Sequence, residues 1–129
     1  MPYTLAPILE IATKTIFLPH RSTPEEGAYT WAEESSLRNR GLVTVQLRAR
    51  RRRLIDEGGR CSEVEDRSYG IDGPVLIPGQ RVSISEHFQA EAASGVLLHC
   101  YEVTTERGEV FTIQTPAYSF DSPFHRAMQ

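Results

Sequence analysis

Short β-prone segments separated by turns run along much of the chain and limit what it can fold into. Six of them have the β-branched or alternating pattern of strands: Ile8 to Phe17, Tyr29 to Leu37, Leu42 to Ile55, Val82 to Phe88, Gly95 to Thr105 and Glu109 to Thr115. Turns are predicted at Pro74, Pro78-Gly79 and Arg107-Gly108. Residues 86 to 94 could instead form a helical turn, because this stretch is rich in Ala. The pattern predicts an all-β fold, an antiparallel β-sandwich of the immunoglobulin-like or fibronectin type III-like shape.

The length and composition fit one compact domain. With 129 residues the chain can bury roughly two-thirds of its unfolded surface, so we expect residues 1–129 to form a single domain. No apolar run approaches the ~20 residues that a membrane span requires. Residues 1–18 hold one Lys, one Glu and no Arg, which argues against a transit peptide or a secretory signal. We therefore expect a cytoplasmic protein without a membrane span, with a mitochondrial location as the alternative if the chain belongs to an organellar assembly.

Ordered landmarks in the turns carry a family resemblance. They are Phe17-Leu18-Pro19-His20-Arg21-Ser22-Thr23-Pro24-Glu25-Glu26-Gly27, then Asn39-Arg40-Gly41, Asp56-Glu57-Gly58-Gly59-Arg60, Pro78-Gly79, Gly95, Tyr101, Gly108, Phe111 and Pro116. Their order and spacing resemble the ApaG family, a small β-sandwich domain found alone in bacteria and inside larger eukaryotic proteins. The resemblance covers roughly residues 8 to 121 and implies the fold that the strand pattern predicts. It also implies binding rather than catalysis, because the eukaryotic domain resembles a protein-interaction module.

The resemblance breaks at one turn. ApaG domains carry a glycine-rich turn of the GxGxxG type, proposed to bind pyrophosphate, after the Glu-Val pair that matches Glu63-Val64 here. Its three glycines fall on Asp66, Ser68 and Ile71. A phosphate cradle needs glycine so that several N–H groups converge without a Cβ in the way, and a carboxylate repels the anion. We therefore expect no phosphate or polyphosphate to bind at this turn.

No group of residues has the arrangement of a catalytic or metal site. Ser22, Ser35 and Ser36 lack a recognisable base and a third partner. Cys61 and Cys100 are expected to be reduced thiols, since the chain shows no signal peptide. The histidines have no ligand spacing and are expected as surface or packing residues: His20, His87, His99 and His125. We expect no enzyme activity, no cofactor, no metal and no small-molecule substrate.

Arginine dominates the basic residues and concentrates on one predicted strand. Of the 14 basic residues 13 are Arg, and seven of these lie in a single stretch that contains no acid. Alternation along the strand divides five of them between two faces, with Arg48, Arg50 and Arg52 on one and Arg51 and Arg53 on the other. Both faces cannot point into one apolar core.

Three interpretations of this strand compete. It is either a solvated edge strand whose arginines pair with the neighbouring Asp and Glu, as charge runs usually do, or a docking surface for a protein partner. Docking has a chemical basis, because guanidinium groups fit carboxylates and phosphates and lose their water more readily than ammonium groups. The third interpretation, contact with RNA phosphate, is weakened because no aromatic residues are interleaved with the arginines.

A carboxylate lies on the expected core face of a neighbouring strand. Trp31 and Leu37 mark that face, and alternation puts Glu33 and Ser35 on it as well. A buried carboxylate without a partner costs several kcal/mol, so Glu33 must pair with an arginine or lie near the rim. Two explanations stay open: a local twist that exposes this end of the strand, or a weakened core that a partner supports.

These observations favour a non-catalytic ApaG-type protein-interaction module that is a structural subunit of a larger assembly. The candidate binding residues are Arg48, Arg50, Arg51, Arg52 and Arg53. The alternative is a ribonucleoprotein component, for example of a mitochondrial ribosome, that contacts RNA phosphate through the same strand. A third function, phosphate or polyphosphate binding, is disfavoured by the lost glycines.

The lost glycines give the first prediction. Isothermal titration calorimetry of the chain with pyrophosphate or a dinucleotide polyphosphate is expected to detect no binding at ordinary salt, because a turn with Asp66 in a glycine position cannot gather N–H groups around an anion. Micromolar binding at that turn would contradict this expectation.

Overall fold

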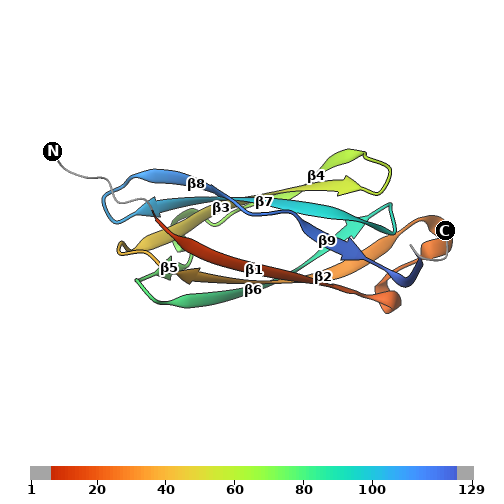
Figure 1. Cartoon of the computed structure of the whole chain (residues 1–129), viewed down its shortest axis with the longest axis horizontal. Coiled ribbons are helices and arrows are strands. Elements are labelled where there is room, and N and C mark those ends of the chain that lie inside the picture. The colour runs from red at the N-terminus through yellow and green to blue at the C-terminus, as the bar shows by residue number, and fades with distance from the viewer. Residues whose placement is uncertain (1–6, 125–129) are drawn as a thin grey trace.

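Two antiparallel sheets face each other in a sandwich (Figure 1). The structure, a computed structural model, describes residues 7–124, except for the side chains of residues 63–66. Its strands are β1 (Leu9–Phe17), β2 (Tyr29–Asn39), β3 (Val45–Asp56), β4 (Cys61–Ser68), β5 (Val75–Leu76), β6 (Arg81–Ala90), β7 (Ser94–Thr105), β8 (Val110–Gln114) and β9 (Tyr118–Asp121). Short 3-10 turns are η1 (Pro19–Arg21), η2 (Pro24–Glu26) and η3 (Gly70–Asp72).

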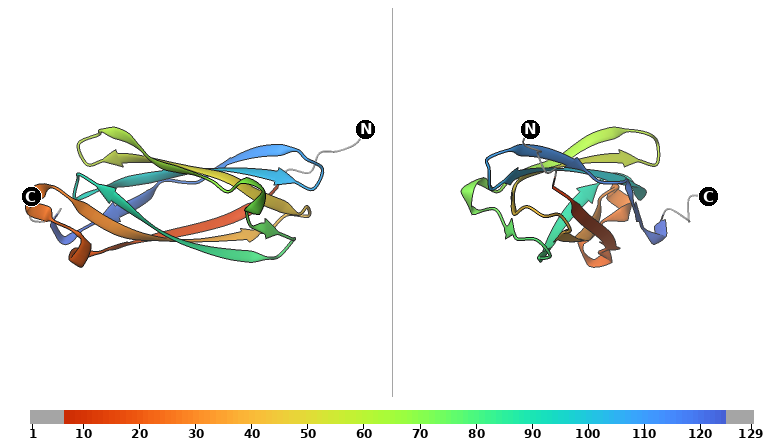
Figure 2. Two further views of the ribbon diagram at one scale, coloured as in Figure 1. Left: turned by 180° about the vertical axis from the view of Figure 1, so that it is seen from behind. Right: turned by 60° about the vertical axis from the view of Figure 1, so that its left-hand side comes forward.

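The two sheets form two layers, which Figure 2 shows from two further directions. The smaller sheet has the order β1-β2-β6. The larger sheet has the order β4-β3-β7-β8, with β5 also paired to β3 and β9 also paired to β7. The arginine-rich strand β3 therefore lies inside its sheet, and the interpretation of it as a solvated edge strand, one of the three that competed, is wrong.

The predicted all-β sandwich is confirmed. All six predicted strands are present with small shifts at their ends. The alternative helical turn within residues 86–94 is wrong, because β6 continues to Ala90 and β7 begins at Ser94. The pattern missed β4, β5 and β9. β4 is rich in charged residues, while β5 and β9 are too short to show a period.

Two apolar clusters occupy the two ends of the interior. The first contains Tyr29, Trp31, Leu54, Phe88, Ala93, Leu97 and Phe120. The second contains Leu37, Val45, Leu47, Leu76, Tyr101 and Val103. Between them the inner faces of β2, β3, β6 and β7 carry polar side chains at the same level: Glu33, Ser35, Arg50, Arg52, Glu86 and His99. The core is thus apolar at both ends and ionic in the middle.

A β-bulge decides which arginines of β3 face this middle layer. The pairing of β3 with β7 shifts register between Leu47 and Ala49, so one extra residue, Arg48, is accommodated there. Before the bulge the odd-numbered residue Leu47 points inward, and after it the even-numbered Arg50 and Arg52 do. The prediction that Arg48 shares a face with Arg50 and Arg52 is therefore wrong.

A buried amide ties one end of the sandwich together. The side-chain nitrogen of Asn39 donates to the carbonyls of Val43 at 2.8 Å and Leu76 at 2.9 Å, and its Oδ1 accepts from the Gly41 N–H at 2.9 Å. Asn39 is fully buried. Its amide therefore joins the β2–β3 connection to β5 by bonds that water cannot replace.

Asn39→Asp tests this link. The carboxylate keeps the acceptor but cannot donate to two buried carbonyls, so we expect the free energy of unfolding in urea to fall by about 3 kcal/mol. The matched control is Gln80→Glu, since exposed Gln80 only accepts through Oε1 from the Ile77 N–H. Equal stability of the two variants would contradict the role given to Asn39.

Candidate functional site on the arginine strand

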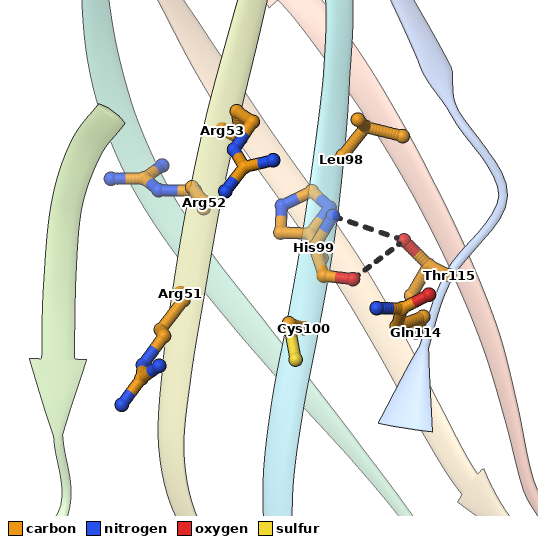
Figure 3. A pocket seen from close by; sticks show the side chains of 8 residues that line it. All are labelled: Arg51, Arg52, Arg53, Leu98, His99, Cys100, Gln114 and Thr115. Carbon is orange, nitrogen blue, oxygen red and sulfur yellow. Dashed lines mark hydrogen bonds between the residues drawn. The ribbon is translucent and has the colours of Figure 1, made fainter. Parts of the chain in front are cut away.

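The arginines predicted as a binding surface lie on both sides of the larger sheet. Arg50 and Arg52 point into the sandwich and are only 3% and 4% exposed. Arg51 and Arg53 point outward and are exposed, as Figure 3 shows for the part of β3 that carries Arg51 to Arg53. Arg48 is half-buried at the bulge, where its carbonyl accepts from the Tyr69 N–H at 2.8 Å. Two of the five candidates, Arg50 and Arg52, are therefore buried and form no part of a binding surface.

Ion pairs link the two sheets through the middle layer. Arg50 on β3 pairs with Glu86 on β6. Arg52 Nη1 lies 3.6 Å from Glu33 Oε1 on β2, and Arg52 Nη2 lies 3.9 Å from Glu86 Oε2. Both guanidinium groups belong to the larger sheet and both carboxylates to the smaller one. Opposite charges thus face each other across the interior.

A histidine and a rim arginine complete this network. Nε2 of His99 on β7 lies 3.1 Å from Glu33 Oε2, with the ring fully buried. At the solvent side Arg67 Nη1 reaches Glu86 Oε1 at 3.1 Å, and Arg67 is about half-exposed. Glu33 therefore bridges Arg52 and His99, while Glu86 bridges the interior and the rim.

The surroundings lower the pKa values of Glu33 and Arg52 and raise that of Tyr101. Burial alone raises the pKa of Glu33, but the His99 hydrogen bond and the charges of His99, Arg52 and Arg50 outweigh it and hold that pKa below its usual value. Burial and the neighbouring Arg50 lower the pKa of Arg52, against the opposing pull of Glu33 and Glu86. Burial likewise raises the pKa of the Tyr101 phenol at the edge of the layer. The layer is therefore a set of mutually dependent charges.

Not every polar atom of the layer has a hydrogen-bond partner. Several buried nitrogens of the layer make no hydrogen bond, namely Arg50 Nε, Arg52 Nε, Arg52 Nη1 and His99 Nδ1. The described residues contain no group of His, Cys, Asp or Glu that could hold a metal ion. The carboxylates that could act as bases already face guanidinium groups inside the protein. This arrangement joins the two sheets by opposite charges.

The outward arginines border a shallow hollow of about 390 Å³. Arg51 lies opposite Cys100 of β7, which lies opposite Gln114 of β8, and Arg53 lies opposite Leu98 (Figure 3). The Cys100 thiol is free and half-exposed. On its other side Arg53 is opposite Glu63, a position whose side chain the structure does not describe. Cationic, apolar and neutral polar side chains therefore meet on one outer face.

Glu33 was predicted either to pair with an arginine or to lie near the rim. The pairing is confirmed, because the residue is 2% exposed and pairs with Arg52. Ser35 is also satisfied, with its hydroxyl 3.0 Å from that of Thr13. His99 was expected as a surface or packing residue, and Glu86 was not singled out, so neither was predicted as a member of the buried ion-pair layer. Only the strand register brings His99, Glu86 and Glu33 to one level, so no motif in the sequence could identify them as a group.

Two of the three positions that correspond to the glycines of the GxGxxG turn have described side chains. Ser68 ends β4 and is exposed, and Ile71 lies in η3 with 83% of its surface exposed. Both cysteines are free, as expected. No helix among residues 7–124 is long and apolar enough to cross a membrane.

Curated relatives decide the family. "Protein ApaG" of Beijerinckia indica is 32% identical over 123 residues, covering 95% of each chain. "Protein ApaG" of Rhodopseudomonas palustris is 36% identical over 115 residues, covering 89% of this chain and 88% of the relative. The chain belongs to the ApaG family.

Solved structures agree with the ApaG fold. A crystal structure of an ApaA protein from Bordetella pertussis superposes with a TM-score of 0.82 at 19% identity, covering 91% of this chain and 95% of the other. A second crystal structure, of the structural genomics target SoR45, has a TM-score of 0.79 at 20% identity, covering 89% and 87%. At such identities the likeness concerns the fold alone. A search of protein-family models found no match.

Glu33→Gln tests the buried layer of this ApaG domain. Removing the charge of Glu33 leaves Arg52 with only the more distant carboxylate of Glu86, so at neutral pH we expect the free energy of unfolding to fall by about 3 kcal/mol. Since the pKa of Glu33 is below its ordinary 4.5 in the folded chain, its carboxylate stabilises the fold above pH 4.5. That contribution disappears as the pH falls through the folded pKa, so the variant should lose less stability than the wild type in this acid range.

Glu34→Gln is the matched control. Glu34 is the next residue on β2 and pairs with Lys14 at 3.2 Å on the surface, where both side chains are largely exposed. We expect a change within about 0.5 kcal/mol. Urea unfolding measured between pH 3 and pH 7 for all three proteins decides the matter, and indistinguishable curves for Glu33→Gln and the wild type would refute the stabilising role.

Proposed function

We propose that this ApaG domain is a non-catalytic protein-interaction module, a structural subunit of a larger assembly that docks through the outer face of β3. One observation carries the proposal: Arg51 and Arg53 are exposed beside a hollow of about 390 Å³ on the outside of the larger sheet. The binding residues reduce to these two, with half-buried Arg48 at the margin. Arg50 and Arg52 support the surface from inside.

The chemistry of the hollow fits a protein segment that carries a carboxylate next to an apolar side chain. Guanidinium groups bind carboxylates through paired N–H donors, and Arg51 and Arg53 are two residues apart on one face, so their heads can reach the same segment. Leu98 supplies an apolar surface between the arginines and β8. Strand β3 is central in its sheet and ion-paired to the other one, so the arginines project from a rigid base.

Charge on the same face argues against RNA. The chain has a net charge of −3. Glu102 follows Cys100 by two residues on β7, is exposed on the same outer face and would repel phosphate. RNA-binding surfaces need several cationic groups along a strand of phosphates, and here Arg50 and Arg52 are turned inward.

The inner residues support a non-catalytic role. Glu33, Glu86 and His99 are the groups of the interior with acid–base chemistry, and each lies within an ion pair or hydrogen bond. Cys100 lies on the outer face, whereas the His99 ring lies on the inner face of the same strand. Among residues 7–124, no imidazole therefore lies beside the thiol to act as a base.

Alanine substitution of the outward arginines tests the function. The tagged wild type and the variants Arg51→Ala and Arg53→Ala are expressed in the native cells, and retention in the assembly is measured before and after nuclease treatment. If a protein partner binds, retention should resist nuclease and fall about tenfold or more in at least one variant, because a buried arginine at an interface contributes about 2 kcal/mol.

Arg81→Ala is the control, since Arg81 is exposed at the start of β6 in the other sheet. Its retention should equal that of the wild type. Loss of retention after nuclease alone would indicate RNA as the partner. Full retention of both outward variants would exclude this face as the docking site.

A further inference from the structure

The four lateral edges of the sandwich are not equally protected. An unpaired edge strand can add a strand from another chain unless a charge, a bulge or a covering segment prevents it. β1 lies against β9, with the Tyr118 hydroxyl donating to the Ile11 carbonyl at 3.0 Å and the Thr15 hydroxyl donating to the Ser119 carbonyl at 3.1 Å. β6 carries the inward charge of Glu86. β4 has an irregular register and carries Arg67, which pairs with Glu86 at the rim. Each of these edges has a protective device.

Strand β8 has none of these devices. Its sequence from Val110 to Gln114 contains no charge and no proline, and its pairing with β7 is regular. Within residues 7–124, β7 is the strand that pairs with β8, so the other side of β8 has no strand beside it. Figure 1 shows β8 at the outer margin of the larger sheet.

The ladder with β7 fixes which backbone groups of β8 face outward. The Thr105 N–H donates to the Glu109 carbonyl, and the Thr115 N–H donates to the His99 carbonyl. Hydrogen-bonded pairs alternate in an antiparallel ladder, so between these two pairs Phe111 and Ile113 direct their N–H and C=O groups to β7. The N–H and C=O groups of Val110, Thr112 and Gln114 therefore point away from the protein, ready to pair with another strand.

We propose that this edge pairs with β8 of a second copy of the chain, antiparallel and with the two-fold axis at Thr112. In this register Thr112 faces Thr112 of the second copy, and Val110 faces Gln114. All these residues present their backbone groups outward, so the hydrogen bonds of both strands are satisfied at once. The larger sheets of two copies then form one continuous sheet.

Side chains make a second copy the fitting occupant. Phe111 and Ile113 are partly buried against the second apolar cluster and face the interior. The proposed register puts Phe111 of each copy opposite Ile113 of the other, so two half-covered apolar side chains cover each other. On the outer face Thr112 meets its own hydroxyl, Val110 (61% exposed) meets an uncharged Gln114, and no like charges are opposed.

Neighbouring registers are excluded by the ends of β8. A shift toward the β7–β8 turn would place strand residues opposite Gly108, which has a φ of 80° and cannot continue a strand. A shift the other way would bring Pro116, which lacks an N–H, opposite Val110. The axis at Thr112 is the register that uses the whole strand.

Introducing a charge at Thr112 tests the register. Sedimentation velocity of the wild type should show a monomer–dimer equilibrium at micromolar to millimolar concentration. Thr112→Lys and Thr112→Glu each place like charges face to face, so each should weaken the dimer about fivefold or more, and an equimolar mixture should recover it. Thr112→Ser should leave it unchanged.

Thr112→Pro separates pairing from folding. The Thr112 N–H points away from β7, so proline leaves the β7–β8 ladder intact while it removes a donor at the dimer axis. We expect a folded monomer by circular dichroism and sedimentation. A wild type that stays monomeric up to about 1 mM, or a mixture of the Lys and Glu variants that associates no better than each alone, would overturn the proposal.

Discussion

The buried ion pairs between the two sheets are the interaction on which the rest of the structure depends. Arg50 and Arg52 on the larger sheet face Glu86 and Glu33 on the smaller one, with His99 bonded to Glu33. Taking such charges out of water is costly, and only their mutual attraction offsets it. Loss of Glu33 or Glu86 would leave a guanidinium charge of the interior without its nearest carboxylate. The apolar clusters on either side exclude the water that would otherwise compensate.

This layer also explains how the two sheets are aligned. Leucines and aromatic residues can slide past one another at little cost, whereas an arginine must meet its carboxylate. Glu33 sits between Trp31 and Leu37 on β2, so a shift of the sheets by one pair of residues would drive a charge into an apolar cluster. We infer that the ion pairs contribute more to a unique arrangement than to the total stability, the role best supported for buried polar groups in other folds.

Much of the fold could be predicted from the sequence, but the orientation of β3 could not be taken from alternation alone. Periodicity predicted six strands and the pairing of Glu33, because these follow from local pattern and the cost of a buried charge. The bulge at Arg48 depends on the pairing with β7, which is not a local property. One signal was present: the positions of Leu47 and Leu54 differ by an odd number, so a strand that buries both must change face between them.

The same bulge determines what the outer surface can do. If β3 kept Arg48 in regular alternation after Leu47, with no bulge, Arg51 and Arg53 would point into the interior and Arg50 and Arg52 would face solvent. The carboxylates of Glu33 and Glu86 would still lie at the middle of the smaller sheet. Both pairs of arginines are chemically equivalent, so composition cannot tell a supporting pair from a binding pair. The strand geometry makes this distinction by matching two positive charges to two negative ones inside, and the arginines that remain, Arg51 and Arg53, face solvent.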